Sequence, residues 1–221
     1  MRPARSAFLL ALCCVCGLGL FSTSAFGADD GGWITLFDGK DLSSWDNGSG
    51  GAPGAGWVIE DGAVTRKERA GYLWSKERFG DFVLELEFKT TGNSGVFFRT
   101  GEPRDCVQTG FEMQVDKPSN PGKHSVGALY DALAPSKNAA IDGWNKVAIT
   151  AIGSKITIDM NDERIVEADL DQWPEAGKNP DGTKNKYRTA LKDFPREGHI
   201  GLQEHGAVVS FRNIRVKPLK K

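Results

Sequence analysis

Three hydrogen-bonding side chains share one face of the segment FEMQVD, residues 111–116. Neighbouring side chains of an extended strand point to opposite faces, so Glu112, Gln114 and Asp116 form its polar face. Such a face fits sugar chemistry, but the spacing excludes an ordinary pair of catalytic carboxylates on this strand. Glu112 and Asp116 are ~13 Å apart at ~3.3 Å per residue, whereas glycosidases hold their pair ~5 Å or ~6.5–9.5 Å apart. Gln114, which stands at a usable distance, cannot be an acid.

A second polar face is predicted in GHIGLQEHG, residues 198–206. Ile200 and Leu202 point to one side of this strand, and Gln203 and His205 point to the other. Amide and imidazole groups on a shallow sheet surface can bind sugar hydroxyls and move protons. We therefore interpret the segment as a strand that is anchored in the core on one face and presents its other face to a ligand.

Arg99, in NSGVFFR, is predicted to lie beside the first polar face. A short connection joins this segment to residues 111–116, so we expect the two strands to be neighbours and Arg99 to lie close to Glu112. An ordinary cross-strand ion pair is the alternative interpretation. Rings that could stack on a pyranose flank the face: Trp45, Tyr130 and Trp144.

Strand patterns dominate the chain after residue 30, and no stretch of ten residues there has convincing helical periodicity. The segments that read as strands, besides 198–206, are 33–37, 56–65, 82–90, 94–100, 111–116, 144–153, 155–170 and 208–216. Many short strands at close spacing predict an all-β, two-sheet antiparallel sandwich of jelly-roll type. Two long polar connections interrupt them. Residues 38–56 are Gly-rich and expected to be mobile, and residues 171–197 are too long for a simple turn, which is typical of a functional or disordered segment.

The first 27 residues predict a secretory signal peptide. Arg2 and Arg5 precede an apolar run over residues 7–21, and small residues follow. The run is shorter than the ~20 residues of a spanning helix. We expect residues 28–221 to form one β-sandwich domain that is secreted or periplasmic and not attached to a membrane once the signal is removed. An uncleaved N-terminal anchor is the alternative.

The cysteine count and the net charge indicate how the domain is stabilised and which partners it lacks. Removal of the signal leaves Cys106 as the one cysteine, so the domain cannot form an internal disulfide and needs a hydrophobic core. We interpret Cys106 as a bystander thiol. Loss of Arg2 and Arg5 takes Lys+Arg from 28 to 26 against 29 Asp+Glu, a net charge of −3. Without a basic stripe, the sequence argues against a nucleic-acid partner.

Seven motifs occur in order and together resemble the 3-keto-disaccharide hydrolase family, also described as a 3-keto-glucoside 1,2-lyase/3-keto-2-hydroxy-glucal hydratase domain. They are LFDGKDLSSW, EDGAV, GNSGVFFR, FEMQVD, GALYD, WNKVAITAIGSKITIDMNDERI and GHIGLQEHGAVVSFRNIRVK. The resemblance spans residues 33–217 and departs at MNDERI, where the family usually has an Asn-Gly turn. It implies a concanavalin A-like lectin/glucanase sandwich and an exported protein that acts on oxidised sugars.

The chemistry that the resemblance implies is a β-elimination. A ketone at C3 acidifies the C2 proton, a base removes it, and the C1 substituent leaves; water can then add, giving net hydrolysis. Either Glu112 or His205 is the expected base, and Arg99 is the expected donor to the enolate oxygen. Gln114 and Gln203 are expected to anchor hydroxyls, with Tyr130, Asp116 and Trp144 as further substrate contacts. No cofactor is firmly expected, although Glu112 and His205 could hold a divalent metal.

Other interpretations stay open at this stage. The same sandwich serves lectins, so a non-catalytic carbohydrate-binding domain is the first alternative. A conventional glycoside hydrolase that recruits Asp131 or Asp181 from a loop is the second. His199 is expected to be structural or at the rim, and His124 could reach the site from its loop. We expect a monomer or a weak homodimer.

Overall fold

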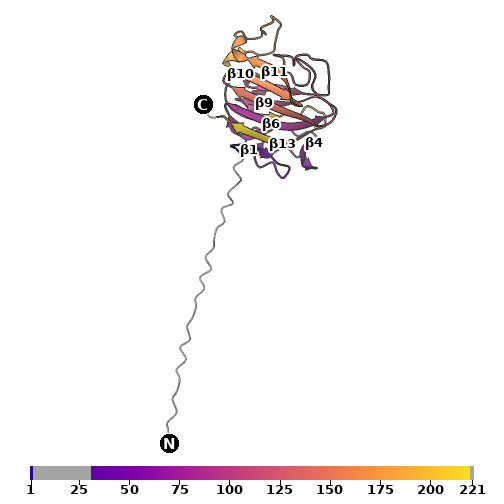
Figure 1. Cartoon of the computed structure of the whole chain (residues 1–221), viewed down its shortest axis with the longest axis vertical. Coiled ribbons are helices and arrows are strands. Elements are labelled where there is room, and N and C mark those ends of the chain that lie inside the picture. Colours follow the sequence, from indigo (N-terminus) through magenta and orange to yellow (C-terminus); the bar gives the residue numbers. More distant parts are fainter. Residues whose placement is uncertain (2–30, 220–221) are drawn as a thin grey trace. The chain divides into compact units, whose positions relative to one another are not determined.

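Alternating apolar residues build two antiparallel sheets that pack face to face (Figure 1). The computed structural model describes residue 1 and residues 31–219, so the predicted signal peptide lies outside the described residues. One sheet has the order β11-β10-β9-β6-β13-β4-β3, with β1 also paired to β13, and the other has the order β2-β5-β12-β7-β8. The predicted all-β sandwich is confirmed.

The strands and short helices have the following bounds. The larger sheet contains β1 (Ile34–Phe37), β3 (Trp57–Glu60), β4 (Ala63–Arg66), β6 (Phe82–Thr90), β9 (Asn145–Ile152), β10 (Lys155–Met160), β11 (Glu163–Asp169) and β13 (Val209–Pro218). The smaller sheet contains β2 (Trp45–Asp46), β5 (Leu73–Phe79), β7 (Ser94–Thr100), β8 (Phe111–Val115) and β12 (Gly198–Leu202). The described helices are α1 (Cys106–Thr109) and three 3-10 turns, Pro103–Asp105, Leu170–Gln172 and Leu191–Asp193.

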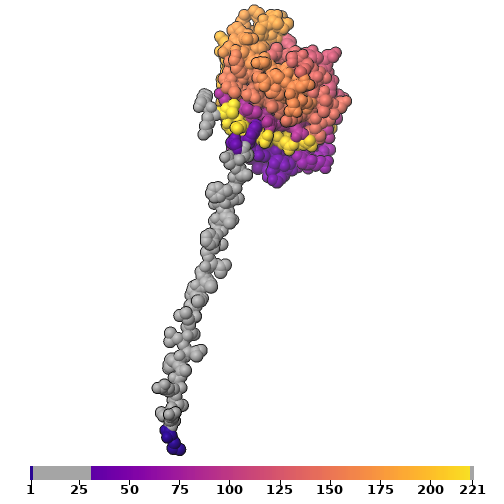
Figure 2. All heavy atoms as spheres, in the orientation of Figure 1, coloured from indigo at the N-terminus to yellow at the C-terminus, as the bar shows by residue number. Residues whose placement is uncertain are grey.

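Period-two burial places the core between the sheets. In β6, Phe82, Leu84, Leu86 and Phe88 are all buried, while the residues between them are partly exposed. Burying each such side chain stabilises the fold by roughly 1.5–3 kcal/mol. Strand β13 lies between β6 and the pair β1 and β4, visible in Figure 2 as a yellow band beside indigo and purple segments. The C-terminal strand therefore lies inside the larger sheet and joins β1 and β4 to β6.

Strands β2 and β5 were not predicted. In β5, Leu73, Trp74 and Ser75 are buried in succession and three exposed residues follow, so the segment lacks the alternation of a half-buried strand. Strand β2 lies in the connection predicted to be mobile. There Trp45 is 1% exposed and donates its indole N–H to Leu36 O at 2.8 Å. Trp45 is part of the core, so the prediction that it flanks the site is wrong.

The connection over residues 171–197 is packed against the sandwich. Its large buried apolar side chains are Trp173, Tyr187, Leu191 and Phe194. They belong to the same apolar cluster as the strands, so this stretch is held in place without regular structure. In residues 31–219 no helix is long and apolar enough to cross a membrane.

Candidate active site

One transverse row of side chains crosses the face of the smaller sheet that points away from the core. The strand register places Trp74 (β5) opposite Gly201 (β12), Gly201 opposite Phe97 (β7), and Phe97 opposite Glu112 (β8). Gly201 leaves space for the Trp74 ring, because a Cβ there would lie 2.4 Å from ring atom Cζ3. The Trp74 ring therefore lies flat over Gly201, and Glu112 is the last residue of the row.

A second row lies two residues further along the strands. Gly95 pairs with Gln114, and the Gln203 backbone N–H donates to Gly95 O at 2.9 Å. Tyr72 precedes β5 and joins the two rows, because its ring stacks on Phe97 with centroids 5.9 Å apart. The polar and aromatic groups of the two strand patterns therefore share one surface.

The two rows border a shallow pocket of about 180 Å³. Its lining residues are Tyr72, Asn93, Val107, Glu112, Gln114, Tyr130, Lys186, Gln203 and His205. The structure thus brings together five of the residues that were predicted from sequence: Glu112, Gln114, Tyr130, Gln203 and His205. They come from β8, from the loop after it and from the segment after β12.

Burial governs the chemistry of Glu112. Its side chain is 5% exposed and accepts a hydrogen bond from Gln203 Nε2 at 3.0 Å. Burial raises the pKa of Glu112 to about 8, while the Lys186 charge and the Gln203 hydrogen bond oppose that rise. Burial also raises the pKa of Tyr72 to about 12, so its hydroxyl stays protonated. A carboxyl that titrates near the working pH is suited to general acid–base catalysis.

Two side chains that line this pocket have a buried amide oxygen without a partner. Gln114 donates from Nε2 to Asn93 Oδ1 at 3.1 Å and to Val115 O at 3.2 Å. Within the described part of the chain, Gln114 Oε1 and Gln203 Oε1 accept no hydrogen bond although both are buried. An unsatisfied buried acceptor costs ~1–3 kcal/mol. A ligand that donates hydroxyl groups would remove that cost.

Lys186 is a site residue that sequence reasoning missed. Its side chain is exposed, and Nζ lies 4.0 Å from the centroid of the Tyr130 ring. Its backbone N–H donates to Asp131 Oδ2 at 2.7 Å, and the hydroxyl of Tyr187 donates to Tyr130 O. These bonds fix the long connection beside the pocket. Its unusual length was the available sequence signal, but irregular backbone gave no pattern that singled out Lys186.

The family model of the 3-keto-alpha-glucoside-1,2-lyase-like domain matches residues 32–217. This chain belongs to that family. A 3-keto-disaccharide hydrolase of Bacteroides thetaiotaomicron is 31% identical, over 86% of this chain and 80% of that protein. The lyase-like family confirms both the resemblance seen in the motifs and the predicted class, a lyase or hydrolase that acts on glycosides.

Two solved structures show the same architecture. A protein from Parabacteroides distasonis ATCC 8503, assigned as a glycosyl hydrolase, is 28% identical and aligns with a TM-score of 0.75 over 85% of this chain and 99% of its own. A beta-1,3-1,4-glucanase (lichenase) from a mouse hindgut metagenome is 11% identical, with a TM-score of 0.50 over 84% of this chain and 98% of its own. The second likeness concerns the fold alone and confirms a glucanase-like sandwich.

Arg99 does not lie in the pocket of this lyase-like domain. Its side chain is fully buried and donates to Gly80 O at 2.9 Å, Gly153 O at 2.8 Å and Asp81 Oδ1 at 2.9 Å. Its φ of 51° breaks the alternation of β7, so the guanidinium points away from Glu112. The prediction that Arg99 lies beside Glu112 and stabilises an enolate is wrong.

Asp116 and Trp144 also lie elsewhere. Asp116 follows the last residue of β8, and its carboxylate accepts from the Lys117 backbone N–H at 2.7 Å, outside the pocket lining. Trp144 precedes β9, which belongs to the larger sheet, and its ring packs under Arg212 at 4.1 Å. Both predictions as substrate contacts are wrong. The strand pattern could not show where β8 ends or which sheet receives β9.

The other histidines and loop acids have local partners. His199 Nδ1 lies 2.7 Å from Ser75 O, which fits the structural role expected of it. His124 Nε2 lies 2.8 Å from Asp131 Oδ1, and its ring packs on Tyr130 without lining the pocket. Asp181 accepts from the Thr183 backbone N–H at 2.9 Å. Neither Asp131 nor Asp181 supplies a second carboxylate to the pocket.

The metal alternative does not fit these residues. Across residues 31–219, no group of three or more His, Cys, Asp or Glu side chains is close enough to hold a metal ion. Glu112 and His205 share the pocket with the cationic Lys186, which competes with a metal for the carboxylate.

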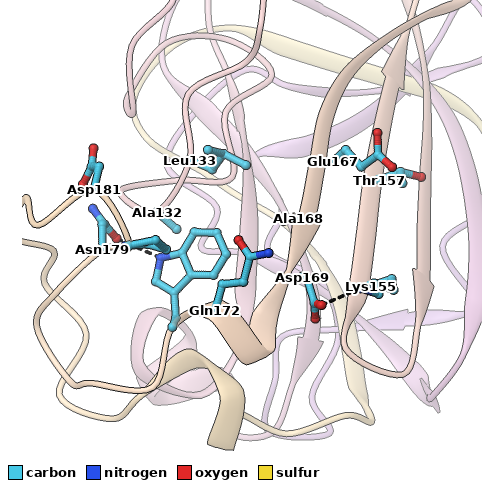
Figure 3. Close-up of a pocket in the computed structure, with 12 residues that line it drawn as sticks. Ala132, Leu133, Lys155, Thr157, Glu167, Ala168, Asp169, Gln172, Asn179 and Asp181 are labelled. Carbon is cyan, nitrogen blue, oxygen red and sulfur yellow. Dashed lines mark hydrogen bonds and ion pairs between the residues drawn. The ribbon is translucent and has the colours of Figure 1, made fainter.

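A larger cavity of about 570 Å³ lies at the edge of the other sheet and contains none of the predicted site residues except the loop acid Asp181 (Figure 3). Two pairs of its polar groups are bonded to each other: Lys155 with Asp169, and the Trp173 indole with Asn179 Oδ1 at 3.0 Å. Volume alone does not identify a catalytic pocket. The smaller pocket has the carboxyl whose pKa burial raises, and two buried amide oxygens without a partner.

Cys106 is expected to be dispensable. Burial raises the pKa of this thiol to about 11, and the nearby Glu112 carboxylate adds to that rise, so the thiolate is scarce at neutral pH. Cys106→Ser should keep near-normal activity and the same mass in solution. Kinetics and light scattering check this, and a loss of activity above tenfold would contradict the interpretation of Cys106 as a bystander.

Proposed function

We propose that this protein cleaves 3-keto-glycosides by removing the C2 proton and eliminating the C1 substituent. The observation that carries the proposal is the composition of the pocket: among its described lining residues, Glu112 is the one carboxylate. Retaining and inverting glycosidases normally use two. β-Elimination needs one base, a donor to the enolate oxygen and a proton for the leaving group, and the pocket offers one group for each.

Glu112 acts as the base. In its ionised form the carboxylate takes the C2 proton, and the electrons of the C2–H bond move onto the C3 oxygen to give an enolate. The ketone then re-forms, its returning electrons make a C1=C2 double bond, and the C1–O bond breaks with its electron pair on the leaving oxygen. A pKa of about 8 gives Glu112 both basicity and a usable ionised fraction near neutral pH. Water addition across that double bond completes a net hydrolysis. The released sugar or alcohol takes one proton.

Lys186 stabilises the enolate oxygen in place of Arg99. Its side chain is exposed at the pocket, and its charge acts on Glu112 electrostatically. His205, also exposed at the rim, supplies the proton to the leaving oxygen. Gln114 Oε1 and Gln203 Oε1 accept hydrogen bonds from the sugar hydroxyls, and Tyr130 lines the side of the pocket.

A pair of substrates tests the proposal. The purified protein is incubated with a 3-keto-glucoside and with the same glucoside before oxidation, and release of the aglycone is measured. Cleavage of the keto sugar alone is expected. Cleavage of both would indicate a conventional glycosidase, and binding of either without cleavage would indicate a lectin-like domain. We further propose export, from the N-terminal sequence pattern.

Lys186→Met is expected to lower kcat/KM by about 10²–10³, the range for loss of one oxyanion donor. Stability should be unchanged, because the side chain is exposed. Removing the charge also removes an effect that lowers the pKa of Glu112, so the alkaline rise in rate should move to higher pH. Lys184→Met, two residues away and also exposed, is the control. Equal rates for both variants would exclude Lys186 as the donor.

A further inference from the structure

Three consecutive residues where β7 begins each contact a different residue of the pocket: Asn93 contacts the Gln114 side chain, Ser94 the Gln203 backbone and Gly95 the Glu112 side chain. Asn93, Ser94 and Gly95 lie under the pocket. On one side of them is β8, the last strand of the smaller sheet, and on the other is the segment after β12. Asn93 lines the pocket directly, while Ser94 and Gly95 are buried beneath it. We call these three residues the NSG segment.

Gly95 determines where the Glu112 carboxyl can lie. Glu112 extends from β8 across the backbone of β7 and reaches Gln203, to which it is hydrogen-bonded at 3.0 Å. A Cβ at residue 95 would lie 2.2 Å from Glu112 Oε1 and 2.9 Å from Cδ. Real Cβ atoms do not approach so closely, because hard-sphere repulsion forbids it. Only glycine leaves room for the carboxyl to pass over this strand.

Ser94 holds the backbone of Gln203, and Asn93 holds the amide side chain of Gln114. The Ser94 hydroxyl donates to Gln203 O at 2.8 Å, while the Gln203 backbone N–H donates to Gly95 O at 2.9 Å. Gln203 is thereby fixed on both sides although β12 has already ended. Asn93 Oδ1 accepts from Gln114 Nε2 at 3.1 Å, which leaves Gln114 Oε1 free for a ligand.

We propose that the NSG segment is the positioning element of the site, with Gly95 setting the location of the Glu112 carboxyl over β7. Its role in turnover rests on the proposed function, but its effect on the position of the carboxyl does not. The segment itself performs no proton transfer: it acts through Glu112, Gln203 and Gln114. A change here should alter how Glu112 titrates as well as how fast the enzyme works.

The test is Gly95→Ala, with the titration of Glu112 as the readout. Protein labelled with ¹³C at the glutamate carboxyls is titrated by NMR, and the Glu112 resonance is assigned by its loss in Glu112→Gln. In the wild type it should titrate near a pKa of about 8. In Gly95→Ala the added methyl pushes the carboxyl toward water, so titration should move toward the ordinary pKa of ~4.3. On a 3-keto-glucoside, kcat should fall about a hundredfold or more.

Gly201→Ala is the matched control. Gly201 is a glycine on the same face of the sheet, in the row next to that of Gly95. A Cβ added there would lie 2.4 Å from the Trp74 ring instead of against Glu112. It should lose stability while Glu112 still titrates as in the wild type. Ser94→Ala is the milder second variant: it should lower kcat/KM by about tenfold at most, because one hydrogen bond to Gln203 is lost.

The outcomes separate the two proposals. A folded Gly95→Ala protein whose Glu112 titrates as in the wild type would overturn the positioning role. If Gly95→Ala does not fold, the double variant Gly95→Ala/Glu112→Asp takes its place, because the shorter acid makes room for the methyl group. A double variant that also fails to fold would show that the Glu112 carboxyl is not what Gly95 accommodates, and would overturn the positioning role. If Glu112 titration shifts as expected but no variant or wild type cleaves the keto sugar, the positioning role stands and the proposed function fails.

Discussion

Glu112→Gln is expected to lower turnover of a 3-keto-glucoside by about 10²–10⁴, the range for loss of a general base. The amide keeps the shape of the side chain and can still contact Gln203 but cannot take a proton, so substrate should bind with little change in affinity. A substrate with deuterium at C2 gives the direct readout. The wild type should show a primary isotope effect, or exchange of that deuterium with solvent if elimination is slower, and the variant should lose both.

The outcome also decides between the two candidate bases. Full exchange and full rate in Glu112→Gln would show that Glu112 is not the base, and His205 would then be the group to test. Gln114→Glu is not a suitable rescue, because it adds a second carboxylate to the same pocket. His205→Ala serves as the comparison: it should slow departure of the leaving group while C2 exchange continues.

Glu112→Gln should also change how the stability of the fold depends on pH. The pKa of Glu112 is raised to about 8 in the folded protein and is near ~4.3 in the unfolded chain, so the folded state binds the proton more tightly. That contribution to stability is fully present below about pH 4 and is lost as pH rises through about 8. Above pH 8 the wild type must hold an ionised carboxylate in a buried place, which Glu112→Gln does not. The variant should therefore be more stable than the wild type there, by on the order of a few kcal/mol. Urea unfolding of both proteins at pH 5 and pH 9 checks this. The same difference in unfolding free energy between variant and wild type at both pH values would contradict it.

Alternation along strands explains which site residues were predictable. Glu112 and Gln114 alternate with apolar residues in β8, and Gln203 continues the pattern of β12, so period two placed all three on the outer face. His205 was also placed at the pocket, and it does line it, although the strand ends at Leu202 and residues 203–205 lie outside any strand. These predictions used only local geometry, which the folded chain preserved.

Failures occurred where tertiary structure overrides local geometry. Arg99 has a positive φ that nothing in FFRTG signals, and its side chain is drawn to carbonyls from two distant turns. Trp144 required knowledge of which sheet β9 joins. Lys186 lies in an irregular connection, where no period relates a residue to a face. In each case the missing information was a contact between segments far apart in sequence.

Arg99→Met is expected to destabilise the protein by about 3–5 kcal/mol, the range for removing one partner of a buried ion pair. Burial lowers the pKa of Arg99 to about 10, so the group is still charged at neutral pH and its charge is compensated by Asp81. Its removal leaves Gly80 O and Gly153 O without the donors that they have now. Arg188→Met is the control, because its ion pair with Asp105 is exposed and should contribute ~1 kcal/mol or less.

The distinguishing measurement for Arg99 is activity per folded molecule. Denaturant unfolding gives the loss of stability, and active-site titration with a tight-binding sugar analogue gives the folded fraction. Arg99→Met should retain kcat after correction for that fraction, because the guanidinium is fully buried and donates to Gly80, Gly153 and Asp81, none of which lines the pocket. A stable Arg99→Met protein with a kcat lowered a hundredfold would show that Arg99 takes part in catalysis, and would count against Lys186 as the donor to the enolate oxygen. Since Lys186→Met should show the opposite behaviour, intact stability with a low rate, the pair of variants separates a charge that holds the sandwich together from one that acts on substrate.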